Sequence, residues 1–252
     1  MLRTRVIPCL LLLNQGLVKT VGFKNPTYVG DPINAVRIFN DKEVDELVFL
    51  DVTATLEKSP PKFDLINDIA TECFMPFGYG GGIHDIETAN RILKMGSEKI
   101  VLNSAARDLS LIREAADIFG SQSVVVSIDV KRSMRGKSVV YTHSGTINTK
   151  LDPVQFAMDV ESAGAGEIFL NSIDRDGSMA GYDIPLVKSV TESVNIPVVA
   201  CGGAGTLTHF QEAILKGGAS AVSAGSMFVF HGPHRAVLIN YPTQDELKQY
   251  VP

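Results

Sequence analysis

One carboxylate ends an apolar run in the middle of the chain and is followed at once by two bases. The run, residues 124–132, reads VVVSIDVKR, and Asp129 is its acid. A strand buried on both faces brings its first polar side chain to its carboxyl end, where sites form in parallel sheets. This position predicts that Asp129 acts as a catalytic acid or base.

The same frame recurs near the amino terminus, but there the acid is missing. Residues 6–13 read VIPCLLLL. An overlay of the chain on itself at a separation of about 118 to 122 positions places Leu11 on Asp129 and Leu13 on Lys131. The overlay predicts two similar half-barrels with a binding lobe in each. It also matches residues 47–54 with 167–177, and residues 76–83 with 197–205.

Two glycine clusters each follow an apolar run directly. Glycine lets backbone N–H groups approach a phosphate closely, and the next helix adds a favourable dipole. The glycines could instead only form tight turns, which is as good an interpretation for either cluster alone, but their duplication favours binding. We therefore predict two phosphate lobes on opposite sides of one rim: Gly80, Gly81, Gly82, Asn103 and Ser104 in the first, and Gly202, Gly203, Gly205, Gly225 and Ser226 in the second.

Three charges lie close together in the loop SIDRDG, residues 172–177. Such a cluster is costly to order unless it hydrogen-bonds a ligand or nearby backbone. We predict that Asp176 binds a ligand hydroxyl or a catalytic water, with Gly177 beside it. For Asp174, a turn capped by its own acids is nearly as good an interpretation.

A second charged set lies at the opposite ends of the predicted strands. Two acids and two bases begin strands one, two, four and six, so they could pair into a ring that closes the barrel axis. Taken alone, the set is best interpreted as a salt-bridged plug that contributes to fold specificity. Its members are Arg5, Glu46, Lys99 and Glu167.

Short β-branched runs alternate with amphipathic stretches along the chain, which is typical of βα units and a parallel sheet. At 252 residues the chain matches one (βα)₈ TIM barrel, so we predict a single α/β domain over residues 1–252. A hairpin is expected at residues 136–150. The predicted strands are residues 5–12, 46–51, 76–79, 99–103, 124–129, 167–171, 197–201 and 219–223. The predicted helices are residues 32–39, 65–71, 86–94, 109–118, 153–162, 184–193, 207–216 and 244–250.

Composition excludes several classes of partner. The net charge of −5 gives no basic face for nucleic acid. Three scattered cysteines, Cys9, Cys73 and Cys201, indicate neither a disulfide framework nor a zinc site, and no cluster indicates another metal or an organic cofactor. The longest apolar stretch is too short to span a bilayer and lacks a signal-peptide cleavage pattern. We expect a cytoplasmic protein that binds a phosphorylated small molecule and no membrane.

Several stretches together resemble the cyclase subunit (HisF family) of imidazole glycerol phosphate synthase, in order and over almost the whole chain. They are RVIPCL, ELVFLDVTA, YGGGIHD, VLNSAA, FGSQSVVVSIDVKR, GAGEIFLNSIDRDG and ACGGAG. The sister isomerase of histidine biosynthesis is a poorer match. The resemblance implies a barrel that forms a heterodimer with a glutaminase through its amino-terminal face. It also implies that the four charged residues form an ammonia gate, and that Lys19 and Asp51 match family binding residues.

The family uses two carboxylates as acid and base, at the ends of strands one and five, for a cyclase and lyase reaction. Asp129 matches the second, but Leu11 stands at the position of the first. Leucine cannot transfer a proton, and Leu13 replaces the lysine expected two residues later. The flanking Asn14-Gln15-Gly16 also departs from the usual acidic turn, so the whole strand-one loop differs from the family.

Three functions remain open. The chain could be a working cyclase of histidine biosynthesis that relies on Asp129, with Asp176 or Asp51. It could resemble the paralogues of surface-polysaccharide (lipopolysaccharide) biosynthesis, glutamine amidotransferase subunits that pass ammonia to a separate sugar-amidating enzyme. It could also be a silent barrel that only activates a glutaminase. We favour the second, because it explains why the gate is kept while one acid is lost.

Overall fold

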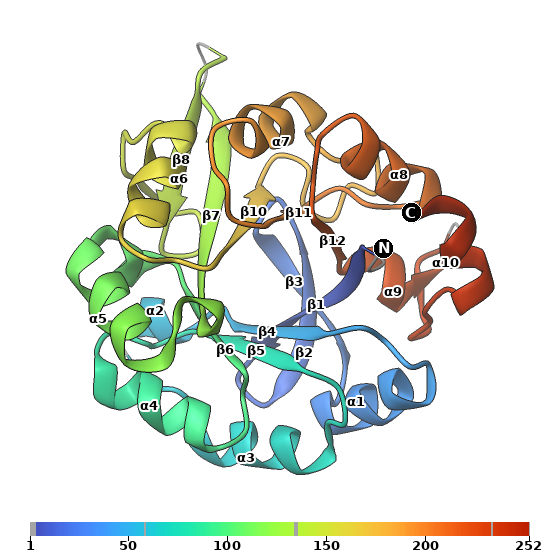
Figure 1. The fold of residues 1–252 in the computed structure, drawn as a ribbon. Coiled ribbons are helices and arrows are strands. Elements are labelled where there is room, and N and C mark those ends of the chain that lie inside the picture. Colours follow the sequence, from blue (N-terminus) through green and yellow to red (C-terminus); the bar gives the residue numbers. More distant parts are fainter. Residues whose placement is uncertain (1–3, 58, 134–135, 233, 252) are drawn as a thin grey trace.

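A ring of parallel strands forms the centre of the computed structural model, which describes residues 4–57, 59–133, 136–232 and 234–251. Within these residues, eight parallel strands close on themselves, the last pairing with the first (Figure 1). The chain is therefore a closed (βα)₈ barrel, as predicted. The strands are β1 (Arg5–Leu13), β4 (Leu47–Asp51), β5 (Phe77–Gly80), β6 (Lys99–Leu102), β7 (Val124–Arg132), β10 (Glu167–Ser172), β11 (Val198–Cys201) and β12 (Ala221–Ala224).

Helices surround the barrel, and many begin at a residue that suits a helix start. Asp85 accepts a hydrogen bond from the backbone N–H of Thr88 at 2.7 Å, and Asp31 and Asp152 cap their helices in the same way. All eight predicted helices are present in the described chain, with ends within about two residues of prediction. They are α1 (Pro32–Asp41), α3 (Phe63–Glu72), α4 (Ile86–Lys94), α5 (Leu109–Phe119), α6 (Pro153–Ser162), α7 (Ile184–Thr191), α8 (Leu207–Leu215) and α10 (Gln244–Tyr250).

The apolar core has two parts. The larger lies between the barrel and the helices, where outward strand residues such as Phe49 and Tyr79 meet helix residues such as Phe39. The smaller fills the barrel axis with inward residues, among them Ile7 and Phe169. This alternation along each strand gives the inner positions of the barrel to the residues of the gate and of the site.

Two antiparallel hairpins extend the barrel above its rim, one from each half. The hairpin predicted at residues 136–150 is present as β8 (Ser138–Thr142) and β9 (Ile147–Asn148), and pairing with β8 lengthens β7 to Arg132, beyond its predicted end. Its counterpart, β2 (Gly16–Val21) with β3 (Lys24–Gly30), was not predicted. The shorter elements are α2 (Ala54–Glu57), η1 (Ser104–Arg107), η2 (Ser121–Ser123), α9 (Ser226–Val229), β13 (Phe230–His231) and β14 (Ala236–Val237).

Candidate functional site

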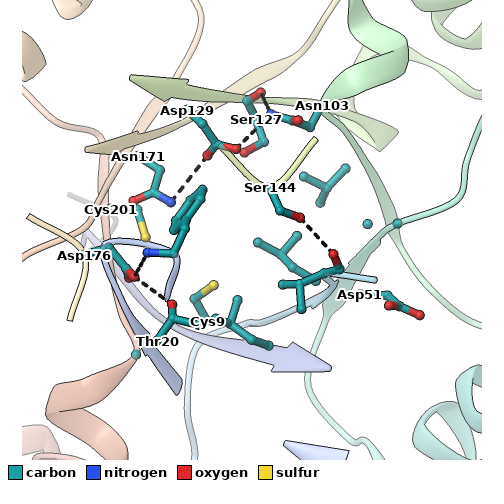
Figure 2. A pocket seen from close by; sticks show the side chains of 18 of the residues that line it. Cys9, Thr20, Asp51, Asn103, Ser127, Asp129, Ser144, Asn171, Asp176 and Cys201 are labelled. Carbon is teal, nitrogen blue, oxygen red and sulfur yellow. Dashed lines mark hydrogen bonds between the residues drawn. The ribbon is translucent and has the colours of Figure 1, made fainter. Parts of the chain in front are cut away.

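A cavity of about 280 Å³ opens at the carboxyl ends of the barrel strands. Figure 2 shows polar side chains gathered around one part of it, with Asp129, Asn103 and Asn171 close together. The cavity brings together nearly all the binding residues that the sequence predicts. Its lining includes Asp129, Lys19, Asp51, Gly81, Gly82, Asn103, Ser104, Asp176, Gly177, Gly202, Gly203, Gly225 and Ser226.

Two amides hold the carboxylate of Asp129. The Nδ2 of Asn103 donates to it at 3.1 Å, and the Nδ2 of Asn171 lies 3.4 Å from its other oxygen. Asp129 is only 7% exposed, and this burial raises its pKa to about 7, with the charge of Asp176 acting in the same direction. A carboxyl with a pKa near neutrality can both deliver and accept a proton, so the site contains one suitable acid–base group.

The matching position of the first half-barrel is apolar. Leu11 lies opposite Leu50 in the β1–β4 pairing, just as Asp129 lies opposite Asn171 in the β7–β10 pairing. Both leucines are half-buried and line the cavity, together with Leu13. Leucine cannot transfer a proton, so the position that matches Asp129 has no acid–base group. The observed register of the two strand pairs agrees with the overlay of Leu11 on Asp129 in the sequence.

Asp176 is tied to the hairpin that follows β1. The hydroxyl of Thr20 donates to its carboxylate at 2.8 Å, and the N–H of Phe23 does so at 3.3 Å. Burial raises the pKa of Asp176, although these hydrogen bonds oppose the shift. Asp174 instead accepts from the backbone N–H of Arg132 at 2.7 Å, which agrees with a structural role.

The second glycine lobe contains a buried cation. Lys19 is 6% exposed, and its ammonium donates to the carbonyl of Cys9. It lies so close to Gly225 that a Cβ there would be 2.3 Å from Nζ, so any side chain at this position would displace the ammonium. Ser226 follows at the start of α9, while Gly202 and Gly203 complete the lobe. Backbone N–H groups and one ammonium together can bind an anion.

The first glycine lobe has an acid rather than a base beside it. A Cβ on Gly81 would lie 2.7 Å from the Cβ of Asp51, whose Oδ1 accepts from the N–H groups of Thr53 and Ala54. The amide of Asn103 is engaged by Asp129, and the hydroxyl of Ser104 accepts from the N–H of His143 at 3.1 Å. These contacts give Asp51, Asn103 and Ser104 structural partners, so their predicted phosphate contacts remain predictions.

The two hairpins meet above the cavity. The hydroxyl of Ser144, at the tip of β8–β9, donates to the carbonyl of Val52 in the other half at 2.8 Å (Figure 2). A Cβ on Gly145 would lie 3.0 Å from the ring of Phe23, at the tip of β2–β3. Segments from opposite halves therefore cover part of the mouth.

The four predicted gate residues form a ring at the other end of the barrel. The Nζ of Lys99 lies 2.8 Å from Glu46 and 2.9 Å from Glu167, and Arg5 pairs with both acids. Burial opposes the charge of Arg5, but the hydrogen bond and charge of Glu167, with those of Glu46, raise its pKa. The ring closes the axis at its amino-terminal end.

Sequence reasoning missed Asn171 as a site residue. Its Nδ2 holds Asp129, and its Oδ1 is a buried acceptor without a partner among the described residues. The signal was its register, since Asn171 occupies the inward position next to Asp129 on the neighbouring strand. The buried thiols of Cys9 and Cys201 also line the cavity, and their mutual hydrogen bond, with burial, raises the pKa of Cys201.

Neither a metal centre nor a membrane span is found in the described part of the chain. No group of three or more His, Cys, Asp or Glu residues there is placed to hold a metal ion. No helix among the described residues is long and apolar enough to cross a membrane.

Comparison with known proteins gives a consistent result. The family profile described as "Histidine biosynthesis protein" matches residues 5–234. The chain is 55% identical over 248 residues to a Pseudomonas aeruginosa protein provisionally named imidazole glycerol phosphate synthase subunit hisF2, covering 98% of this chain and 99% of that one. It is 48% identical over 254 residues to a similarly named HisF subunit of Leptospira borgpetersenii, and both chains are covered completely. A Vibrio vulnificus protein provisionally named hisF3 is 46% identical, with 99% of this chain and 96% of that one covered.

Proposed function

The chain belongs to the histidine biosynthesis protein family as a HisF-like barrel subunit, and we propose that it conducts ammonia. In this proposal a glutaminase docks on the amino-terminal face of the barrel and releases ammonia at the charged ring. The ammonia passes along the axis to the cavity and then to a separate enzyme that amidates a sugar in polysaccharide biosynthesis.

The proposal rests mainly on one observation. The ring of four charged residues at the amino-terminal end of the barrel is complete, whereas the rim above it has only one of the family's two acids. The ring joins Arg5 and Lys99 to one acid from each half, whereas the rim keeps Asp129 and has Leu11 in the matching place. Imine formation and ring closure need protons to be both delivered and removed. A barrel that retains the ring without the second acid is better suited to passing ammonia on than to using it.

The barrel interior supports transfer of a neutral molecule. Above the ring the axis is lined by Ile7, Val48 and Val125, which would exclude ammonium because burying an unpaired charge is very unfavourable. At the far end of the axis, beside Asp129, lies the Oδ1 of Asn171, which has no hydrogen-bond partner among the described residues. This acceptor suits an arriving N–H donor.

A second candidate is the cyclase reaction itself, for which two observations speak. The pKa of Asp129, about 7, suits a group that must act in turn as acid and as base. Asp176 lines the same cavity and could replace the acid missing at Leu11. The relatives named above carry the name of that enzyme.

The two candidates differ in what the purified complex does. The chain would be reconstituted with a glutaminase and with a candidate sugar-amidating enzyme. We expect glutamine-driven amidation to require the barrel, whereas free ammonium should bypass it. Lys99→Trp should abolish the glutamine-driven reaction alone. Arg113→Trp, an equally bulky change of an exposed base on α5, is the matched control.

Two results would contradict ammonia transfer to a sugar. Conversion of the formimino ribulosyl nucleotide to imidazole glycerol phosphate at a physiological rate would establish the cyclase instead. Unaltered glutamine-driven amidation with Lys99→Trp would eliminate the channel. If glutaminase activity needed the barrel but all ammonia leaked to solvent, the barrel would be only an activator.

A further inference from the structure

Two buried cysteines lie close together at the floor of the cavity. Cys9 on β1 and Cys201 on β11 both line the cavity and both belong to the apolar core of the barrel axis, so they lie where the axis meets the cavity. Figure 2 shows their side chains on the same side of the cavity. Each thiol is a hydrogen-bonding partner of the other. Neither acid–base chemistry at Asp129 nor the passage of ammonia gives this pair a role.

The strand registers place the two cysteines in one layer of the barrel. Inside a (βα)₈ barrel, the side chains of one layer come from alternate strands, with a stagger of about one residue per strand. When the registers are followed round the barrel, the layer of Cys9 continues with Gly80, Ser127 and Cys201, from the third, fifth and seventh strands. Cys9 and Cys201 are therefore neighbours in a layer whose other members are small.

The strand between them leaves room for the two sulfur atoms. Both β1 and β11 pair with β12. Gly225, which follows β12, has no side chain, and a Cβ there would lie 3.2 Å from the carbonyl oxygen of Cys9. The hydroxyl of Ser223 donates to the carbonyl of Ile7 at 2.8 Å. The thiols of Cys9 and Cys201 can thus face each other past this strand.

The separation of the two strands does not suit a disulfide. Neighbouring strands lie about 4.8 Å apart, so residues of one layer on alternate strands have Cα atoms about 9 Å apart. A disulfide requires Cα atoms less than about 7 Å apart. Joining Cys9 to Cys201 would therefore require movement of the barrel backbone, which the hydrogen bonds of β12 to both neighbouring strands oppose.

An ion bonded to both sulfur atoms fits this separation without such movement. Thiolate sulfur is the ligand that soft cations such as Cu⁺ prefer. Metal–thiolate bonds of about 2.3 Å, the length found with zinc, would hold two sulfur atoms in line at about 4.6 Å. The side chains of Cys9 and Cys201 both reach into the barrel from their strands and make up the remaining distance.

The number of ligands and the local charge select a monovalent ion. Structural Zn²⁺ sites have four ligands. In the described part of the chain, no group of three or more His, Cys, Asp or Glu residues is placed to hold a metal. Two thiolates with one monovalent cation leave one negative charge, which would be costly to bury alone. The buried ammonium of Lys19, which donates to the carbonyl of Cys9, supplies the opposite charge.

We propose that Cys9 and Cys201 bind one soft monovalent cation of the Cu⁺ class, held between their two sulfur atoms at the floor of the cavity. The ion replaces the two thiol protons and lies where the barrel axis meets the cavity. This site is independent of ammonia transfer, since it needs neither a glutaminase nor a sugar-amidating enzyme.

Binding of Cu⁺ to the full chain would be measured without oxygen, with the coloured Cu⁺ chelator bicinchoninate as competitor. We expect the protein to withdraw one Cu⁺ per chain. Cys9→Ser and Cys201→Ser should each weaken Cu⁺ binding by at least about a hundredfold, because a single thiolate remains. Ag⁺, a soft ion of the same charge that needs no reductant, should give the same pattern. Zn²⁺ should bind at least about a hundredfold more weakly than Cu⁺.

Cys73→Ser is the matched control. The sulfur of Cys73 lies 3.1 Å from the thioether sulfur of Met75, and neither residue lines the cavity. Because this pair offers only one thiolate, Cys73→Ser should leave the affinity for Cu⁺ unchanged. Circular dichroism would verify that each variant is folded. X-ray absorption of the unaltered protein with Cu⁺ should show two sulfur neighbours and no third ligand, a result that does not depend on any variant.

Four outcomes would overturn the inference. The folded protein could fail to withdraw Cu⁺ from the chelator, or Cys73→Ser could lose the binding that Cys9→Ser and Cys201→Ser retain. X-ray absorption could show three or four ligands. Diamide could join Cys9 to Cys201 in a disulfide without disturbing the fold, which would contradict the spacing of the strands. Each outcome is measured without a glutaminase, so failure here would leave ammonia transfer to its own test.

Discussion

The two half-barrels offer opposite chemistry at equivalent positions of one rim. In the second half, Asp129 lies next to Asn171 and is buried in amide contacts; in the first, Leu11 lies next to Leu50 and both are half-buried. The strand register is the same in both. Backbone ladders and the outer core fix the register, so the rim residues are free to differ. A symmetric fold therefore does not require symmetric chemistry.

The largest change in stability is expected at the amino-terminal end of the barrel, where charged residues of both halves form ion pairs. Lys99→Met would leave Glu46 and Glu167 close together with only Arg5 between them. Removing one partner of a buried ion pair destabilises by about 3–5 kcal/mol. We expect urea unfolding to show a loss of this size. Lys188→Met, at an exposed position of α7, should change the free energy of unfolding little. An equal loss of stability in Lys188→Met would contradict the special role of the buried ring.

A smaller effect is expected from the acid that only the second half retains. The pKa of Asp129 is about 7 when folded, against about 4 in the unfolded chain. Between these values the folded protein binds more protons, so the free energy of unfolding falls as pH rises and levels off above 7. From pH 5 to pH 8 this group accounts for a loss of about 2–3 kcal/mol.

Asp129→Asn should abolish that component of the pH dependence. Urea unfolding at pH 5 and pH 8 would measure it as the difference between the unaltered protein and the variant. Leu11→Asn is the matched control, because it places the same amide at the equivalent position without removing a titrating group. An unchanged slope in Asp129→Asn would show that the carboxyl titrates at an ordinary pKa.

Restoring an acid to the first half should have a moderate effect. Leu11→Asp places a carboxylate beside Leu50, where no amide holds it, and loses apolar burial. We expect a destabilisation of about 1–2 kcal/mol at pH 8, with a smaller value at pH 4, where the carboxyl is protonated. Adding Leu50→Asn recreates the Asp129–Asn171 pairing and should recover part of the loss. An identical loss at both pH values would mean that the new carboxylate is fully solvated.

The smallest effect concerns the contact between the halves above the cavity. Ser144→Ala removes the 2.8 Å hydrogen bond to the carbonyl of Val52. Because the contact is only partly buried, we expect a loss below about 1 kcal/mol of stability. Hydrogen exchange should nevertheless become faster in the β8–β9 hairpin, whereas Thr146→Ala, within the same hairpin, leaves the cross-contact intact. Unchanged hydrogen exchange in Ser144→Ala would mean that this contact between the halves does not stabilise the β8–β9 hairpin.

The barrel strands could be predicted from the sequence because they are short apolar runs, several of them rich in Val and Ile, between amphipathic helices. The β2–β3 hairpin could not. Its turn residues Gly22 and Phe23 both have positive φ, which is unusual for phenylalanine, and Pro26 lies inside the second strand, where proline argues against a strand. Edge position and contact with Asp176 stabilise this hairpin.

Site residues could be predicted where their type and their position in an apolar run point to a function. They could not be predicted where their role depends on how two strands are aligned. Asp129 ends an apolar run, and the four charges begin theirs, so pattern alone finds them. Asn171 is found only when strands β7 and β10 are aligned, since its importance lies in the neighbour that it holds. The sequence predicts that Asn103 binds phosphate, and in the structure its amide donates a hydrogen bond to Asp129.

The charged ring also bears on whether half of this molecule could exist by itself. Both bases, Arg5 and Lys99, belong to the first half, which supplies only one acid, Glu46. The second half supplies Glu167 alone. A separated first half would carry an excess cation at its base and a separated second half an unmatched anion. The halves are thus electrostatic complements, and their similar sequence patterns do not make them interchangeable.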